Sequence, residues 1–159
     1  MKKINDKEFF EIVSDILDNE EFLKRKKYKH HGNISVYDHS LKVSYLSYKC
    51  AKKMGLNKYD AAIGGLLHDF YYKPWNENCK KKKFFEKHGF VHAKEALENS
   101  KFFFKNNLNN VREDIILKHM FPLNIKLPKY RESWLIVVID KYVSLEVLKQ
   151  PNFFKDIFK

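Results

Sequence analysis

The chain has 159 residues, of which 44% are hydrophobic, so it can form one domain with a sizeable core. Its 5 glycines and 4 prolines are too few for an all-β fold with many tight turns. The longest purely apolar run, Trp134 to Ile139, is far shorter than the about 20 residues that cross a bilayer. The first residues also lack the apolar stretch of a signal peptide, so we expect a cytoplasmic protein that does not enter a membrane.

The formal net charge is +11, and two explanations for it stay open. The lysines could reflect an AT-biased genome, since Asn, Phe, Tyr and Ile are also abundant, or they could favour an anionic partner. They scatter along the chain without a nucleic-acid motif, so we do not expect DNA or RNA as a partner. Cys50 and Cys79 fit neither a metal motif nor a disulfide framework, which is typical of a reducing compartment.

Nearly every segment has a hydrophobic period near that of an α-helix, and none alternates convincingly as a strand would. The pattern predicts six helices, at about residues 9–17, 37–54, 58–69, 91–102, 111–119 and 132–148. Asn57 and Asn110 are suited to cap two of them, and Gly55 and Pro151 to end two others. A polar, aromatic and basic loop is expected from Tyr71 onwards. No repeat or second domain boundary is visible, which predicts a single all-α domain.

A histidine and an aspartate, His68 and Asp69, close the apolar run that begins at Ala61. Burying a carboxylate beside an imidazole is costly unless a partner or a metal compensates. One metal ion could use both groups, because imidazole nitrogen and carboxylate oxygen are ordinary ligands of zinc, iron and manganese. Other polar residues with apolar neighbours, on or at the ends of predicted helices, are His39, His92, His119 and Asp140. Together these residues predict a metal centre.

The order of these residues resembles that in the HD-domain superfamily of metal-dependent phosphohydrolases. The resemblance rests on the segments around His39, around His68 and Asp69, and around Asp140, and it covers about residues 30–145. It implies an all-α bundle of about six to eight helices within a single HD domain, residues 1–159. It also implies that these four residues hold a first metal ion.

His92 and His119 resemble the two additional histidines with which HD proteins hold a second metal, and Asp69 would then bridge the two ions. The resemblance thus implies divalent metal cofactors, two in number, and the ligand types suit iron, manganese, nickel, cobalt or zinc. The alternative is that both histidines donate hydrogen bonds over a single metal. In either case His68 and Asp69 would be the catalytic residues.

The implied activity is hydrolysis of a phosphoric monoester, diester or anhydride in a nucleotide or another small phosphorylated compound. A metal-activated water would be the nucleophile, at a mono- or dinuclear centre. Lys73, four residues after Asp69, and Lys141 are the candidate substrate-binding residues, because a cation there could neutralise phosphate charge. We assign His30 at most a substrate contact. The alternative function is a non-catalytic module that senses a nucleotide or a metal through the same pocket.

Overall fold

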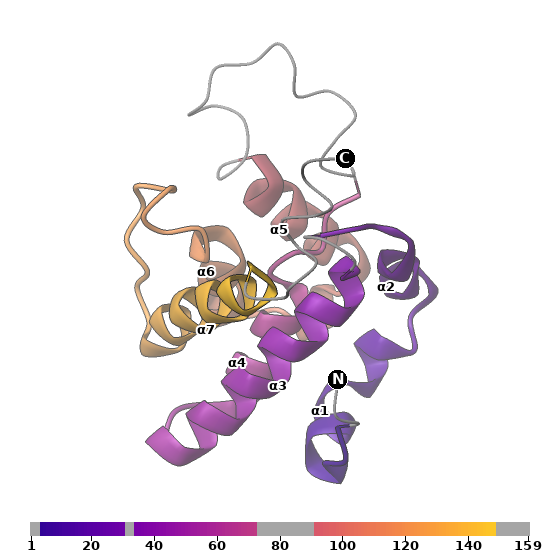
Figure 1. The fold of residues 1–159 in the computed structure, drawn as a ribbon, viewed down its shortest axis with the longest axis horizontal. Helices are drawn as coiled ribbons and strands as arrows, with labels where there is room; N and C mark the ends of the chain where they lie inside the picture. The colour runs from indigo at the N-terminus through magenta and orange to yellow at the C-terminus, as the bar shows by residue number, and fades with distance from the viewer. Residues whose placement is uncertain (1–3, 31–33, 73–90, 149–159) are drawn as a thin grey trace.

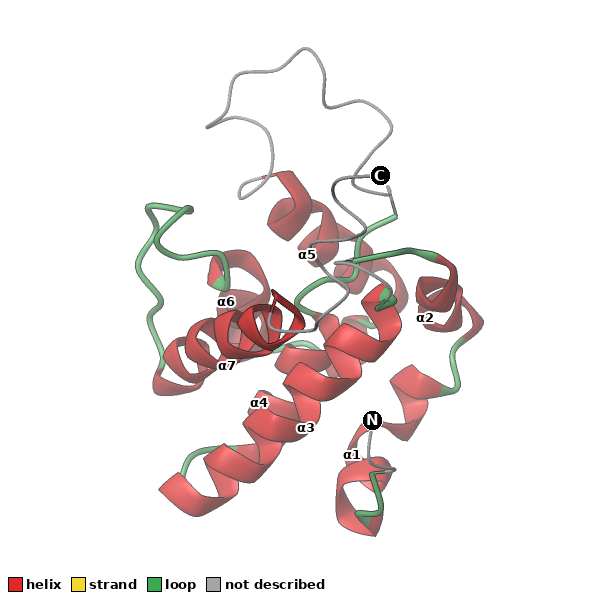
Figure 2. Ribbon diagram, in the orientation of Figure 1, coloured by secondary structure: helices red, strands yellow, loops and turns green. Residues whose placement is uncertain are grey.

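The computed structural model of the chain describes residues 4–30, 34–72 and 91–148. Within these ranges it contains α-helices and no strand, which confirms the expected all-α class (Figures 1 and 2). The helices are α1 (Lys7–Leu17), α2 (Glu20–Leu23), α3 (Val36–Met54), α4 (Lys58–Leu67), α5 (Val91–Phe103), α6 (Asn110–Lys118) and α7 (Arg131–Leu148). Short 3₁₀ helices at Lys24–Lys27 and Lys105–Asn107 follow α2 and α5.

Helix α4 is the central helix of the bundle. Residues 60–67, eight of its ten, are buried, as expected for a helix that is covered on all sides. It contacts α1, α3, α6 and α7, and Figure 1 shows α6 and α7 on one side of the α3–α4 pair and α1 and α2 on the other. The backbones of α3 and α4 approach closely at Gly65, where an added Cβ would lie 3.0 Å from Ser44 Cα. Ser44 Oγ also donates a hydrogen bond to Ala62 O across this contact, at 2.6 Å.

Short polar side chains and one glycine define the helix ends. Asn57 caps α4, and Gly55 ends α3 in the left-handed conformation with a φ of 66°, both as expected. The expectation that Asn110 caps α6 is wrong, because Asn109 accepts the hydrogen bond from Arg112 N and Asn110 is the first residue of the helix. The two neighbouring asparagines are equally able to cap, so the place of the first helical turn decides between them.

Arg25 is fully buried and holds the backbone that follows the His-Asp pair. Its guanidinium donates a hydrogen bond to Tyr71 O. The guanidinium carbon lies 4.3–5.0 Å from the ring centroids of Tyr28, Phe70 and Tyr72, whose faces attract a cation. Burial lowers the pKa of Arg25. The chain that leaves α4 is therefore fixed by a cation surrounded by aromatic rings.

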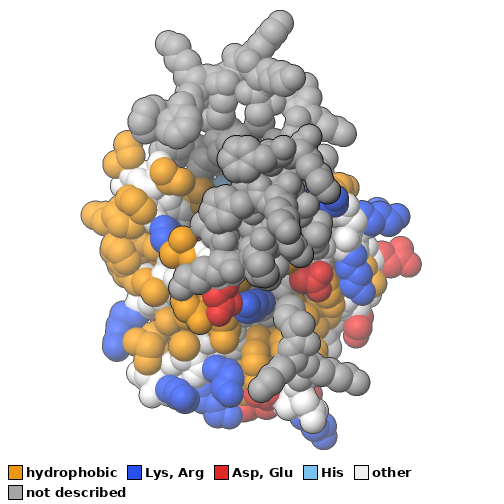
Figure 3. Space-filling view, viewed as in Figure 1, with side chains coloured by type: hydrophobic (Ala, Val, Ile, Leu, Met, Phe, Trp, Pro, Cys, Tyr) orange, Lys and Arg blue, Asp and Glu red, His pale blue; other side chains and the backbone are white. Residues whose placement is uncertain are grey.

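Large apolar side chains remain exposed on α7 and in the connection that precedes it, among them Ile125, Leu127 and Val138. Figure 3 shows apolar side chains gathered on the side of the molecule where these elements lie, with Lys and Arg side chains dispersed over the visible face. Among the described residues, the Lys and Arg side chains visible in this view do not form a single basic patch. No described helix is long and apolar enough to cross a membrane.

Candidate metal centre

Five helices bring the six predicted residues together. Three of these residues lie on α3, α5 and α7, and the other three directly follow the last residues of α4 and α6. In chain order they are His39, His68, Asp69, His92, His119 and Asp140. All except His92 are buried, with relative exposures between 0% and 8%. Two carboxylates and four imidazoles therefore share one interior space.

The first group of ligand atoms joins α3, α4 and α7. His39 Nε2 lies 3.0 Å from Asp140 Oδ1 and 3.8 Å from Asp69 Oδ2. His68 Nε2 lies 3.6 Å and 3.4 Å from the same two oxygens. Two atoms bound to one ion by bonds of about 2.1 Å are about 3.0 Å apart at a right angle and about 3.4 Å apart at a tetrahedral angle. These four atoms are therefore spaced as the ligands of one cation would be.

The second group joins α5, α6 and the other oxygen of Asp69. His92 Nε2 lies 3.1 Å from His119 Nε2. Asp69 Oδ1 lies 3.6 Å from the former atom and 3.4 Å from the latter. These separations also fall near those expected for ligands of one cation. Each oxygen of Asp69 thus faces a different group, which is the arrangement that a bridging carboxylate requires.

His68 and His119 are oriented by the same local device. Each follows the last residue of a helix, and its Nδ1 lies within hydrogen-bond distance of a carbonyl three residues earlier: 2.7 Å to Gly65 O and 2.8 Å to Ile116 O. Because a carbonyl can only accept, this network assigns a proton to Nδ1 and turns Nε2 towards the carboxylates. Among the described residues, His68 Nε2 is buried and has no hydrogen-bond partner. Beside ionised carboxylates this nitrogen needs a cation, which is a proton in the metal-free protein. A metal ion can take the place of that proton, so these residues fit a metal ion.

The electrostatics of the centre also favour a cation. Burial lowers the pKa of His39 to about 4. Burial lowers the pKa of His68 too, but the charges of Asp69 and Asp140 outweigh that effect and raise the value to about 9. Burial would raise the pKa of both carboxyl groups, yet the neighbouring histidines hold both values far below the ordinary range. Both aspartates are therefore ionised at neutral pH and present two negative charges to the site.

Of the two lysines predicted to bind substrate, Lys73 lies outside the described residues. Lys141 is half-buried, and its Nζ lies 3.5 Å from His119 O and from Val137 O. Burial lowers its pKa. The ammonium thus lies beside the backbone of a candidate ligand. Tyr71, in the expected loop, is buried with its ring centroid 5.6 Å from that of His92.

His30, which is not among the predicted ligands, also lies at the centre. Its Nε2 lies 3.0 Å from Asp69 Oδ2, and its ring stacks on His39 with centroids 3.9 Å apart and an interplanar angle of 13°. It precedes α3 in an irregular connection, where no helical periodicity marks a buried face. The only available signal was its position within the family resemblance, nine residues before His39.

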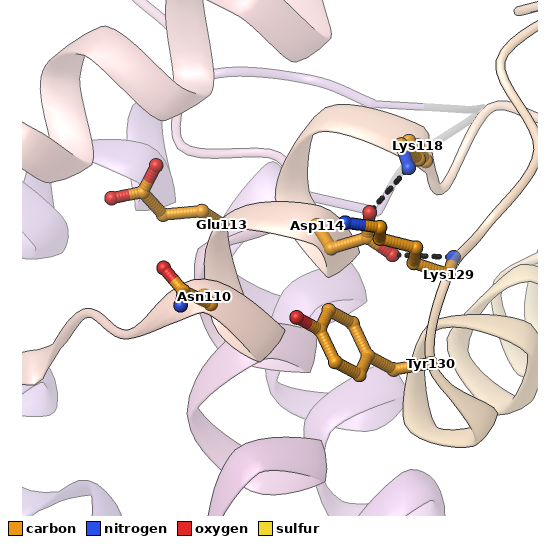
Figure 4. Close-up of a pocket in the computed structure, with 6 residues that line it drawn as sticks. All are labelled: Asn110, Glu113, Asp114, Lys118, Lys129 and Tyr130. Atoms are coloured by element: carbon orange, nitrogen blue, oxygen red, sulfur yellow. Dashed lines mark hydrogen bonds and ion pairs between the residues drawn. The ribbon is translucent and has the colours of Figure 1, made fainter.

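A separate hollow of about 400 Å³ lies beside α6 and the residues that lead into α7, and none of the six predicted residues lines it (Figure 4). Its central carboxylate, Asp114, pairs with Lys118 Nζ at 2.5 Å. Asp114 also accepts hydrogen bonds from Lys129 N at 2.8 Å and Ser133 Oγ at 2.7 Å. Because both oxygens of Asp114 are engaged, this cluster ties α6 to α7.

Comparison with known protein families identifies the class of the chain. The model of the HD-domain family matches residues 36–145, more than half of the sequence, so the chain belongs to the HD-domain family. The match confirms the resemblance inferred from the order of the histidines and aspartates. It places the protein in a superfamily of metal-dependent phosphohydrolases, and the clustered His and Asp residues are compatible with divalent metal binding. The comparisons with curated proteins and with solved structures gave no significant match.

Proposed function

We propose that the protein is a metal-dependent phosphohydrolase that acts on a nucleotide or another small phosphorylated compound. The observation that carries the proposal is the arrangement around Asp69. One oxygen of this carboxylate faces His39 and His68, the other faces His92 and His119, and the separations suit two cations. An intact ligand set is what hydrolysis requires, whereas a sensor could lose the positions that activate water.

In this proposal His39, His68, Asp140 and one oxygen of Asp69 hold the first ion. The second ion is held by His92, His119 and the other oxygen of Asp69. Divalent ions bound there would lower the pKa of a coordinated water and offset the negative charge of the phosphate group.

The residues of the chain have three tasks. The helix-end carbonyls Gly65 O and Ile116 O keep the Nε2 atoms of two histidines available as ligands. The low pKa of Asp69 keeps it ionised, so it can bridge two cations and orient the nucleophile. Lys73 and Lys141 supply positive charge for the phosphate. The net charge of +11 would favour an anionic substrate over a cationic one at the encounter.

Purified chain would be tested for metal content and for phosphate release. The wild type would be loaded with manganese, iron, nickel, cobalt or zinc and assayed against a panel of nucleotides and small phosphoesters. We expect two metal ions per chain and turnover of a preferred substrate. Asp69→Ala should abolish turnover and reduce bound metal while the helical circular-dichroism signal persists. Asp15→Ala, which removes an exposed aspartate on α1, is the matched control and should behave as wild type.

Two outcomes would refute the proposal. Full activity of metal-free Asp69→Ala protein would show that the carboxylate and its metals do not carry the reaction. Tight nucleotide binding without phosphate release, for every metal tested, would assign the pocket to sensing.

A further inference from the structure

A short antiparallel backbone pairing holds His30 at the candidate metal centre. His30 N donates to Ile34 O at 2.9 Å, and Val36 N donates to Tyr28 O at 2.8 Å. Lys29 and Ser35 form an isolated antiparallel bridge between these two hydrogen bonds. The residue is thereby tied to the first turn of α3, one turn before His39. Backbone hydrogen bonds, and not only the side-chain rotamer, therefore fix the position of His30.

The contacts of the His30 ring engage two of the proposed ligands. A carboxylate oxygen accepts hydrogen bonds, so His30 Nε2–H donates to Asp69 Oδ2 across 3.0 Å. A carboxylate oxygen has two lone pairs, so Oδ2 can accept this hydrogen bond and still face the first group of ligand atoms. The stacked ring also covers one face of His39. With a relative side-chain exposure of 12%, His30 is screened from water, which strengthens its hydrogen bond.

We propose that His30 is a positioning residue of the metal centre, which fixes the rotation of the Asp69 carboxylate so that its two oxygens face two different groups of ligand atoms. This inference rests on the proposed metal centre and adds a residue that lies before the matched family region of 36–145. Removing a hydrogen-bond partner of a metal ligand typically lowers the metal affinity by about 10–100-fold. The same loss is expected here, and it should fall on both ions because both depend on the orientation of one carboxylate.

The test measures the binding of Mn²⁺ alone to chelator-treated full-length protein, by calorimetric titration. His30→Ala should bind Mn²⁺ about 10–100-fold more weakly than wild type. His30→Gln places an amide N–H near the position of Nε2 and should restore most of the affinity. Lys29→Ala is the matched control, because this exposed neighbour takes part in the antiparallel pairing through its backbone, and it should bind as wild type.

Two results would overturn the role of His30. One is wild-type Mn²⁺ affinity in His30→Ala; if the melting temperature of the metal-free variant is also lower, the residue is merely structural. The other is an affinity in His30→Gln as low as that in His30→Ala, which would exclude the hydrogen bond as the cause.

Hydrolysis is scored separately by phosphate release from the substrate panel. If His30→Ala binds Mn²⁺ more weakly than wild type, but the wild type releases no phosphate, the proposed function is refuted and the positioning role is supported. A wild type that releases phosphate while His30→Ala binds Mn²⁺ normally would refute only the positioning role.

Discussion

Gly65→Ala should weaken both the fold and metal binding, because Gly65 lies where α3 and α4 meet. The added Cβ would lie 3.0 Å from Ser44 Cα and 3.3 Å from Ser44 N, and backbone atoms cannot move aside as a side-chain end can. Overpacking of this kind costs about 1–3 kcal/mol, while alanine in place of glycine in a helix returns about 1 kcal/mol. Separating the helices also strains the Ser44–Ala62 hydrogen bond, worth about 1 kcal/mol. We expect a net loss of about 1–3 kcal/mol in the free energy of unfolding.

The same displacement should lower metal affinity. Gly65 O accepts from His68 Nδ1, and Ser44 belongs to the helix that carries His39, so separating α3 from α4 moves two candidate ligands apart. Urea unfolding of chelated protein measures the stability loss, and Mn²⁺ titration measures the affinity. Gly55→Ala is the control: its φ of 66° is unfavourable for alanine by about 1–2 kcal/mol, but no atom lies within 4 Å of the new Cβ. Wild-type stability in Gly65→Ala, or an equal affinity loss in Gly55→Ala, would refute this reasoning.

Metal-free protein should lose stability as the pH rises from about 6.5 to about 9. The pKa of His68 is raised in the folded state, so the stabilisation is complete below 6.5 and disappears as the pH passes the folded value of about 9. The melting temperature of chelator-treated protein, measured between about pH 6 and about 9.5, checks this prediction. A melting temperature that does not change over this pH range would contradict it. Lys52, Lys58 and Tyr48 lower the pKa of Glu8 from 4.5 to about 2. Glu8→Gln should therefore destabilise the protein above pH 4.5, and the difference from wild type should shrink as the pH falls towards 2; a pH-independent difference in melting temperature would exclude the ion pairs as its cause.

The proximity of His39, His68 and Asp140 could be anticipated from the sequence because each lies on, or directly after, a predicted helix that contains many apolar residues. Such a residue must face the interior, and several interior polar residues must share partners. The helix ends could be predicted less accurately from the sequence. Asn109 and Asn110 are both able to cap α6, and only the position of the first helical turn distinguishes them. Helix α2, with four residues, is too short to produce a periodic signal.

His30 could not be assigned from the sequence for a different reason. Its contact with Asp69 depends on an antiparallel pairing made by backbone hydrogen bonds, which leave no pattern in the side chains. The contacts of Lys141 could not be predicted from the sequence either. Its neighbour Asp140 faces the centre, and the long lysine side chain reaches back to His119 O, so helical position alone did not give its surroundings.

The convergence of five helices on one centre also has a consequence for the lifetime of the protein. Ligands drawn from chain positions 39 to 140 would make each bound ion a cross-link between segments that separate on unfolding. A free-metal concentration 100-fold above the dissociation constant would add about 2.7 kcal/mol to the free energy of unfolding. The fraction of unfolded chains open to proteolysis would then vary with the metal supply, so scarcity of the metal would reduce the amount of protein as well as the proposed hydrolysis.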